Sequence, residues 1–317
     1  MSYDKLMYKG TPAINKDIII EHSQPSLGIE EKKALLEVYK STYISEGPLT
    51  RKFESDLADY LEISSVRCLP SGYVALLLSI TAMGGDSLKV IMPSYVCREV
   101  YDAVLLSGAE PVLCDIGEDF NISVEEIKKK LAVKAKKKSM LLLPHMYGLP
   151  ADIDKYLEIG IPVLEDCAHT IGARYKGKCT GSFGVAGILS FETTKMMTTG
   201  YGGAIVSKNK KFIEKIERLR VNMPLINGPQ YSFYFSDIQS AIGIAQLKKI
   251  PSFIEKRARI SERYFREFEN LPIVLPRRYP DRDHIFYRFT IGSSKKKPSQ
   301  VMKQAIENGF KIRQVVP

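Results

Sequence analysis

Short apolar runs alternate with helix-like stretches through the middle of the chain. Runs of this length, bounded by glycine, proline or polar residues, predict buried β-strands. We expect seven strands, at residues 66–69, 88–92, 111–115, 139–144, 162–165, 186–191 and 203–207.

Apolar residues at helical spacing predict helices between these strands, at 72–82, 97–106 and 124–135. Strands separated by helices indicate βαβ units, and hence an α/β fold with a mainly parallel sheet between helical layers. Ligands of such sheets bind at the carboxyl ends of the strands. Polar residues directly after a predicted strand are therefore the first candidates for a functional site.

The pattern changes after the last predicted strand. Ser236 and Gln239 form a potential capping box that opens a helix reaching about residue 247. Further along we expect a charged helix at 251–270, a linker at 272–279, a strand at 285–291 and a helix at 298–308. This organisation predicts a large α/β domain with an N-terminal helical segment at 1–250, and a short, small α+β domain at 251–317.

The chain has 317 residues and a formal net charge of +10. Much of this charge lies in one lysine-rich segment, 128–138, which the predicted helix would expose to solvent. No stacking aromatic residues are interleaved with it, so nucleic-acid binding has only the net charge in its favour. A basic protein also attracts anionic small substrates, such as nucleotide diphosphates.

Five cysteines are widely spaced and form no CxxC pair, which argues against both a disulfide framework and a metal site. The N-terminus lacks the apolar core of a secretory signal, and no uncharged stretch is long enough to span a membrane. We therefore expect a cytoplasmic protein that does not interact with membranes.

Three polar residues follow predicted strands in a pattern typical of one kind of chemistry. Asp166 and His169 come directly after the strand at 162–165, and Lys195 follows the strand at 186–191. A lysine whose pKa is lowered by its surroundings can hold a carbonyl group as an imine. Taken alone, Lys195 is more simply a surface lysine, Asp166 a turn residue and His169 a structural histidine.

These residues meet the demands of pyridoxal 5'-phosphate (PLP), which needs four kinds of protein group. Lys195 would hold its carbonyl carbon, Asp166 would keep the pyridine nitrogen protonated, and His169 would cover the flat ring. Ser71 and Gly72 come between a predicted strand and helix, where backbone N–H groups can bind the phosphate. Ser71 is also explained as an ordinary helix cap.

Several longer motifs resemble those of the DegT/DnrJ/EryC1/StrS family, PLP-dependent sugar aminotransferases of fold type I (aspartate aminotransferase-like). The resemblance covers nearly the whole chain, and its two central motifs are highly specific. They are Glu165-Asp166-Cys167-Ala168-His169-Thr170-Ile171-Gly172-Ala173, and Ser190-Phe191 through Lys195 to Thr198-Thr199-Gly200-Tyr201-Gly202-Gly203.

The resemblance implies catalytic roles for Lys195, Asp166 and His169, with PLP held as a Schiff base on Lys195. It also implies homodimers that share active sites, and transfer of an amino group, usually from glutamate, to a nucleotide-linked keto-sugar in polysaccharide or glycoconjugate synthesis. The expected cofactor-binding residues are Ser71, Gly72, Tyr73, Cys97, Asp166, His169, Ser190, Lys195 and Ser232.

Some of these positions depart from the family pattern. Tyr73 replaces a threonine of the phosphate cup, and Cys97 replaces an aromatic residue that stacks on the ring. Ser232 and Tyr234 replace an asparagine and an arginine in the segment that enters the neighbouring active site, and the chain ends sooner than family members do. These departures leave an alternative function open: a PLP-binding protein with little transaminase activity and a regulatory or assembly role.

Overall fold

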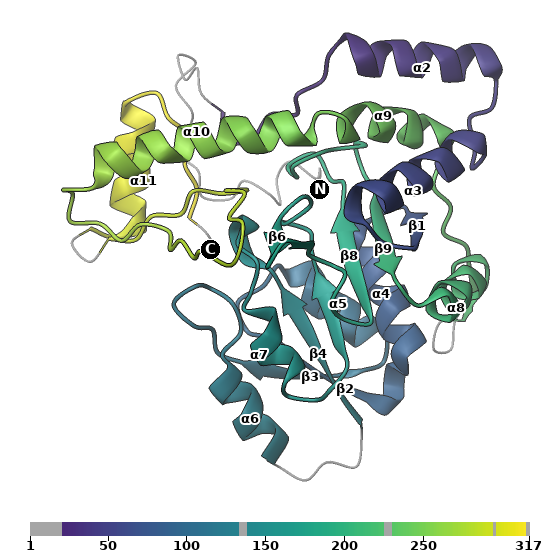
Figure 1. Cartoon of the computed structure of the whole chain (residues 1–317), viewed down its shortest axis with the longest axis horizontal. Helices are drawn as coiled ribbons and strands as arrows, with labels where there is room; N and C mark the ends of the chain where they lie inside the picture. The colour runs from purple at the N-terminus through teal and green to yellow at the C-terminus, as the bar shows by residue number, and fades with distance from the viewer. Residues whose placement is uncertain (1–20, 133–137, 225–229, 294–295, 315–317) are drawn as a thin grey trace, which may run out of the picture.

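A seven-stranded sheet forms the centre of this computed structural model, which describes residues 21–132, 138–224, 230–293 and 296–314 (Figure 1). All seven predicted strands are confirmed, with ends shifted by at most one residue. In chain order they are β1 (Ser65–Leu69), β2 (Leu88–Pro93), β3 (Glu110–Cys114), β4 (Lys138–Pro144), β5 (Val163–Asp166), β8 (Ala186–Ser190) and β9 (Gly203–Ser207).

The strand order in the sheet is β1-β9-β8-β5-β4-β2-β3. Only β9 runs against its two neighbours, while all other adjacent pairs are parallel. The predicted α/β class with a mainly parallel, mixed seven-stranded sheet is therefore confirmed. Because β9 is reversed, its first residue lies at the same edge as the last residues of β1 and β8.

Helices cover both faces of the sheet, because alternate side chains of each strand point to opposite faces. Val90 and Ile91 illustrate the alternation, since they belong to different apolar clusters. The cluster on one face includes α4 (Gly72–Met83), α5 (Arg98–Leu106) and α8 (Lys210–Val221). The clusters on the other face include α3 (Pro48–Leu61), α6 (Val124–Ala132), α7 (Ile153–Leu157) and the end of α9 (Asp237–Leu247).

The remaining elements are shorter or lie outside these layers. They are α2 (Ile29–Ser41), α10 (Ile250–Phe268), α11 (Pro298–Glu307), the 3-10 turns η1 (Gly85–Ser87) and η2 (Met146–Gly148), and the two-stranded pairs β6 (Arg174–Tyr175) with β7 (Lys178–Cys179) and β10 (Met223–Pro224) with β11 (Gln230–Tyr231). Figure 1 shows α10 extending from the layered part toward α11. Across the described residues, no helix combines the length and apolarity needed to cross a bilayer.

Buried carboxylates attach the N-terminal helices to α9. Asp237, the first residue of α9, accepts hydrogen bonds from the backbone N–H groups of Gly47, Leu49 and Thr50 at the start of α3. Asp237 thereby satisfies N–H donors that α3 cannot pair internally. Ser236 and Gln239 form the predicted capping box at the start of α9.

The C-terminal part departs from the prediction at one segment. Residues 285–291 do not form a strand, because Ile285 and Arg288 donate their backbone N–H groups to the loop carbonyls of Gly148 and Tyr147. Phe286 also has a φ of 47°, which interrupts an extended backbone. The predicted helix at 298–308 is confirmed, and that at 124–135 is confirmed as far as Ala132. The rest of the latter lies outside the described residues, and the domain boundary at residue 250 stays a prediction.

Candidate active site

Strand ends from the middle of the sheet bring the predicted site residues together. Asp166 ends β5 and Ser190 ends β8. Gly203, at the start of β9, pairs with both Ser190 and Leu69, the last residue of β1. The turn after β1 therefore lies beside Ser190, although the two are far apart in the sequence.

This turn approaches β8 and β9 very closely. A Cβ on Gly72 would lie 3.0 Å from the Cβ of Ser190, and one on Gly203 would lie 2.5 Å from the backbone nitrogen of Gly72. Position 203 therefore requires glycine, and a side chain at position 72 would force Ser190 to move. Ser71 caps α4 by accepting a hydrogen bond from the N–H of Val74 at 3.1 Å. The predicted phosphate-binding residues Ser71, Gly72 and Ser190 thus surround the N-terminus of α4, which favours anions.

Asp166 has few partners for a buried carboxyl group. The hydrogen bond from the N–H of Ala168, at 3.0 Å, is the one that the described residues give it. Burial raises the pKa of Asp166, while this hydrogen bond and the charges of Lys195 and His145 act in the opposite direction. A buried carboxyl group in this state favours a cation or a strong hydrogen-bond donor.

Lys195 lies in a turn closed by its own N–H, which donates to the carbonyl of Glu192. Its charge also affects Cys97, the residue before α5. Cys97 is exposed as a whole residue, but partial desolvation of its thiol raises the thiol pKa, the charge of Lys195 lowers it and that of Asp166 raises it. Lys195, Asp166 and Cys97 are therefore close enough in the structure for their charges to affect one another.

His169 stacks on the ring of Tyr287, with centroids 4.4 Å apart and planes 19° apart. The ring of Tyr147 lies farther away, at 6.1 Å. Burial, followed by the charges of Lys195 and Arg288, lowers the pKa of His169 well below its ordinary value. His169 is therefore neutral at physiological pH.

Sequence reasoning assigned no site role to Tyr147 or Tyr287. The lysine Nζ is 5.6 Å from the centroid of the Tyr287 ring, so this tyrosine belongs to the site. Its segment was expected to be a strand. The clustering of Phe286, Tyr287 and Phe289 was the available signal, but aromatic residues are also typical of strands.

Two of the predicted cofactor-binding residues, Tyr73 and Ser232, have other contacts within this chain. Tyr73 packs against the apolar cluster of α4 and α5, where burial and the charge of Asp102 raise its pKa. Ser232 is exposed and donates a hydrogen bond to the carbonyl of Val221 at 2.8 Å. Among the described residues, no hydrogen bond joins either side chain to Lys195 or Asp166, and their role at the cofactor stays a prediction.

Known proteins are similar to this chain along most of its length. The sequence profile of the DegT/DnrJ/EryC1/StrS aminotransferase family matches residues 25–316. The chain belongs to this family. It is 31% identical to the GDP-perosamine synthase of Vibrio cholerae over 284 residues, which are 84% of this chain and 76% of that protein.

Solved structures of other proteins have the same fold. PseC of Helicobacter pylori, an aminotransferase involved in the biosynthesis of pseudoaminic acid, matches with a TM-score of 0.83 and 24% identity, over 92% of this chain and 82% of that one. Spr1654 of Streptococcus pneumoniae, in its PLP-form, matches with a TM-score of 0.84 and 22% identity, over 92% of this chain and 83% of that one.

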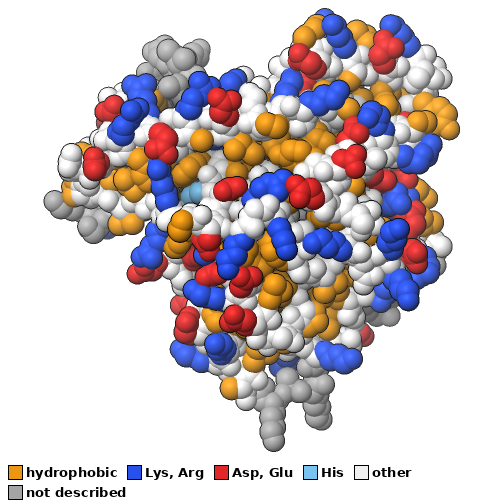
Figure 2. Space-filling model, in the orientation of Figure 1, with side chains coloured by type: hydrophobic (Ala, Val, Ile, Leu, Met, Phe, Trp, Pro, Cys, Tyr) orange, Lys and Arg blue, Asp and Glu red, His pale blue; other side chains and the backbone are white. Residues whose placement is uncertain are grey.

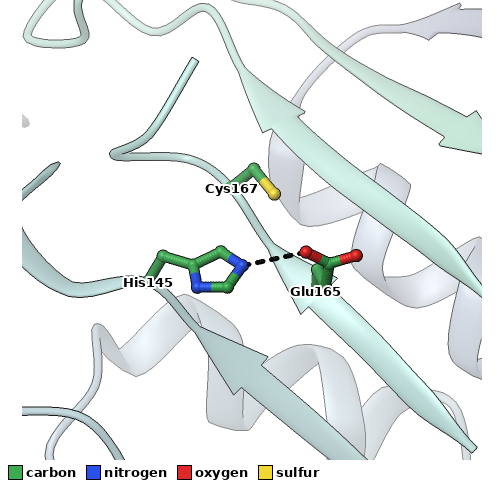
Figure 3. A group of neighbouring side chains, drawn as sticks. All are labelled: His145, Glu165 and Cys167. Carbon is green, nitrogen blue, oxygen red and sulfur yellow. Dashed lines mark hydrogen bonds and ion pairs between the residues drawn. The ribbon is translucent and has the colours of Figure 1, made fainter. Parts of the chain in front are cut away.

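Next to Asp166, the family motif contributes a second buried acid with a different environment (Figure 3). Glu165 accepts hydrogen bonds from the N–H groups of Gly181, Phe183 and Gly184, and its Oε2 is 3.1 Å from Nε2 of His145. Nδ1 of His145 accepts from the N–H of Ala151, so Nε2 carries the proton that bonds to Glu165.

Glu165, His145 and Cys167 are close enough together to suggest a metal site. However, hydrogen bonds already use both ring nitrogens of His145, and burial raises the pKa of the Cys167 thiol well above its ordinary value. Hydrogen bonding therefore accounts for the trio without an ion. The hydrogen bonds of Glu165 hold the end of β5, and therefore also Asp166, against the loop at 181–184.

Replacing Glu165 by glutamine tests this support. Although burial opposes ionisation, His145 and the backbone N–H groups lower the pKa of Glu165 below its ordinary value of 4.5. Its contribution to stability is therefore present above about pH 4.5 and is lost as the pH falls through the lowered pKa. We expect Glu165→Gln to cost about 3 kcal/mol in the free energy of unfolding at pH 7.

Urea unfolding at several pH values measures this effect. The variant should lose less stability than the wild type between pH 5 and pH 3, because one titrating group is gone. Glu158→Gln, at an exposed position, is the matched control and should change stability by less than about 0.5 kcal/mol. An equally small change for Glu165→Gln would contradict the supporting role.

Proposed function

We propose that the protein is a PLP-dependent aminotransferase that moves an amino group from glutamate to a nucleotide-linked keto-sugar. The observation that carries this proposal is that the carboxyl group of Asp166 is buried and interacts with the positive charge of Lys195. The related GDP-perosamine synthase supports a nucleotide sugar as the acceptor. We place the reaction in polysaccharide or glycoconjugate synthesis, which the relative named as a spore coat polysaccharide biosynthesis protein of Bacillus subtilis also supports.

The residues of the site fit PLP. Asp166 offers a buried carboxylate oxygen to a protonated pyridine nitrogen, and this charge-assisted bond would compensate for the burial of the acid. Ser71, Gly72 and Ser190 lie close together at the N-terminus of α4 and would form the phosphate cradle, since helix N-termini favour anions. Lys195 supplies the amine for the Schiff base.

When bound, PLP supplies an electron sink for the carbon that loses or gains the amino group. The protein residues provide the other requirements. Lys195 moves the proton at the substrate carbon, and Asp166 keeps a positive charge on the ring nitrogen. Neutral His169, stacked on Tyr287, provides a flat surface without adding a positive charge that would oppose protonation of the nitrogen.

The position of Tyr73 is compatible with PLP binding, which the proposed function and the alternative without transaminase activity both require. A tyrosine directed into the phosphate cradle would obstruct it, but Tyr73 packs among α4 and α5 instead. The charges of Lys195 and Asp166 both act on Cys97, which supports its predicted place at the cofactor.

The matched pair Asp166→Asn and Asp154→Asn tests the proposed function. Asparagine cannot hold the pyridine nitrogen protonated, so we expect Asp166→Asn to lower the rate of amino transfer from glutamate by about 100-fold or more, or about 2.7 kcal/mol. Asp154 is partly exposed and pairs with Lys176, so its variant should retain the wild-type rate. Single-turnover absorbance of the cofactor measures both rates. Equal rates for all three proteins would show that another acid has this role.

We also propose a homodimer in which each copy completes the active site of the other. Large apolar side chains on and near α2 are exposed, with Tyr39 at 80% and Leu27 at 61%. Figure 2 shows hydrophobic side chains in a band across the upper part of the visible face, while acidic and basic ones are interspersed. Exposed Ser232 lies in a surface segment held to Arg220 and Val221, which is available to a second copy.

Sedimentation equilibrium tests the dimer, and we expect twice the mass of one chain. An acid at position 39 would be buried without a partner in the interface, so Tyr39→Asp should shift the mass toward that of the monomer. Lys33→Asp, elsewhere on α2 and exposed, should remain dimeric. A monomeric wild-type protein would contradict the proposal.

We further propose a cytoplasmic location. All five cysteines are free thiols in the structure, and four of them are buried. Unpaired cysteines are typical of a reducing compartment. Periplasmic or extracellular recovery of the protein with paired cysteines would contradict this location.

A further inference from the structure

Arg288 lies beside the candidate active site, on the segment that was expected to be a strand. Its guanidinium carbon is 4.3 Å from the centroid of the Tyr287 ring, and the amine of Lys195 is 5.6 Å from the same centroid. Two cationic groups therefore flank one tyrosine ring, which itself stacks on His169.

The backbone of this segment is held firmly in place. The N–H of Arg288 donates to the carbonyl of Tyr147 at 3.2 Å. On the other side, Nη1 of Arg257, from α10, donates to the carbonyls of Phe286 and Tyr287 at 3.2 and 3.1 Å. Arg257 thus acts as a positioning residue for Tyr287 and Arg288.

The two arginines lack an ion-pair partner in the described part of the chain. Among the described residues, no carboxylate forms an ion pair with Arg257 or Arg288. Burial and then the charge of Arg288 lower the pKa of Arg257, and the charge of Arg288 also contributes to a low pKa for His22. Partly buried positive charges without a counter-charge cost stability. Their presence here requires an explanation that the fold does not supply.

Arg288 also retains unused hydrogen-bonding capacity. Its side chain donates to Oγ of Ser23 at 3.0 Å and to the carbonyl of Tyr287 at 3.4 Å. A guanidinium group has five N–H donors, so three of them have no acceptor among the described residues. Guanidinium groups bind carboxylates and phosphates through paired N–H donors.

We propose that Arg288 binds an oxyanion of the substrate and thereby positions the reacting carbon near Lys195. This inference rests on the proposed aminotransferase function, because both substrates of that reaction carry such a group. The amino-acid donor has a carboxylate on the carbon that bears its amino group, and the nucleotide sugar has a diphosphate. Arg288 determines the affinity for one of them or, in the two halves of the reaction, for both.

Calorimetric titration of the PLP-loaded protein with glutarate and with inorganic diphosphate tests the proposal. Glutarate represents the donor without its reactive amino group, and diphosphate represents the nucleotide sugar. We expect Arg288→Gln to weaken the binding of at least one probe about tenfold or more, or about 1.4 kcal/mol. Arg288→Lys keeps the charge but loses the paired donors, so its affinity should be intermediate.

Arg259→Gln, an exposed arginine on α10, is the matched control and should bind both probes as the wild type does. Weaker binding of glutarate alone identifies the donor carboxylate, and weaker binding of diphosphate alone identifies the nucleotide sugar. Weaker binding of both indicates a subsite shared by the two substrates. The proposal is overturned if the wild type binds neither probe, or if Arg288→Gln binds both within twofold of the wild type.

These titrations do not depend on turnover. A protein that binds a probe through Arg288 but transfers no amino group would contradict the aminotransferase and leave the oxyanion subsite intact. If Arg288→Gln transfers amino groups normally and binds the probes as the wild type does, the oxyanion subsite is contradicted and the aminotransferase is not. An unaltered cofactor absorbance and thermal unfolding midpoint in Arg288→Lys exclude misfolding as the cause of weaker binding.

Discussion

The burial of the Asp166 carboxyl group at the end of β5 is the constraint on which the site depends. An acid in this position is unfavourable unless a positive charge or strong donor faces it. Lys195 acts on the Asp166 carboxyl group through its positive charge, without a hydrogen bond between the two. The N–H of Ala168 donates a hydrogen bond to one carboxyl oxygen. A protonated pyridine ring has the charge and the donor that this environment lacks. The proposed cofactor would thus complete the surroundings of an acid that the described residues leave incompletely paired.

The sheet brings the other parts of the site to this acid. Reversal of β9 puts Gly203 at the edge where β1 and β8 end, and two glycines allow the turn after β1 to touch Ser190. Beneath the edge, Glu165 points away from the site and uses its hydrogen bonds to hold the loop at 181–184. Two consecutive acids therefore have opposite roles, because successive side chains of a strand point to opposite faces.

The sheet and most of the site were predictable from the sequence for a common physical reason. Buried strands of a parallel sheet have clear apolar runs, and Asp166 and Lys195 follow two of them directly. Ser71 and Gly72 have a local signal of their own, since they join a strand to a helix. Family resemblance supplied the specific roles of these residues.

Tyr287 and Arg288 were not predicted as site residues, because no neighbouring residues in the sequence determine their position. Their backbone hydrogen bonds go to Tyr147 and to Arg257, both of which are distant in the sequence. The aromatic pattern of 285–291 is equally compatible with a strand, and only the positive φ of Phe286 and the contact with Gly148 decide against it. The cofactor roles of Tyr73 and Ser232 come from resemblance alone and stay predictions, because the role of Ser232 concerns the active site of a second copy.

The central claim is that PLP is bound through Lys195, opposite Asp166. Reduction of the PLP-loaded protein with borohydride, followed by peptide mass spectrometry, tests this claim most directly. The account predicts that the added pyridoxyl group is found on the peptide containing Lys195, and on no other lysine in stoichiometric amount. An unmodified Lys195, or a pyridoxyl group fixed to a different lysine, would contradict it.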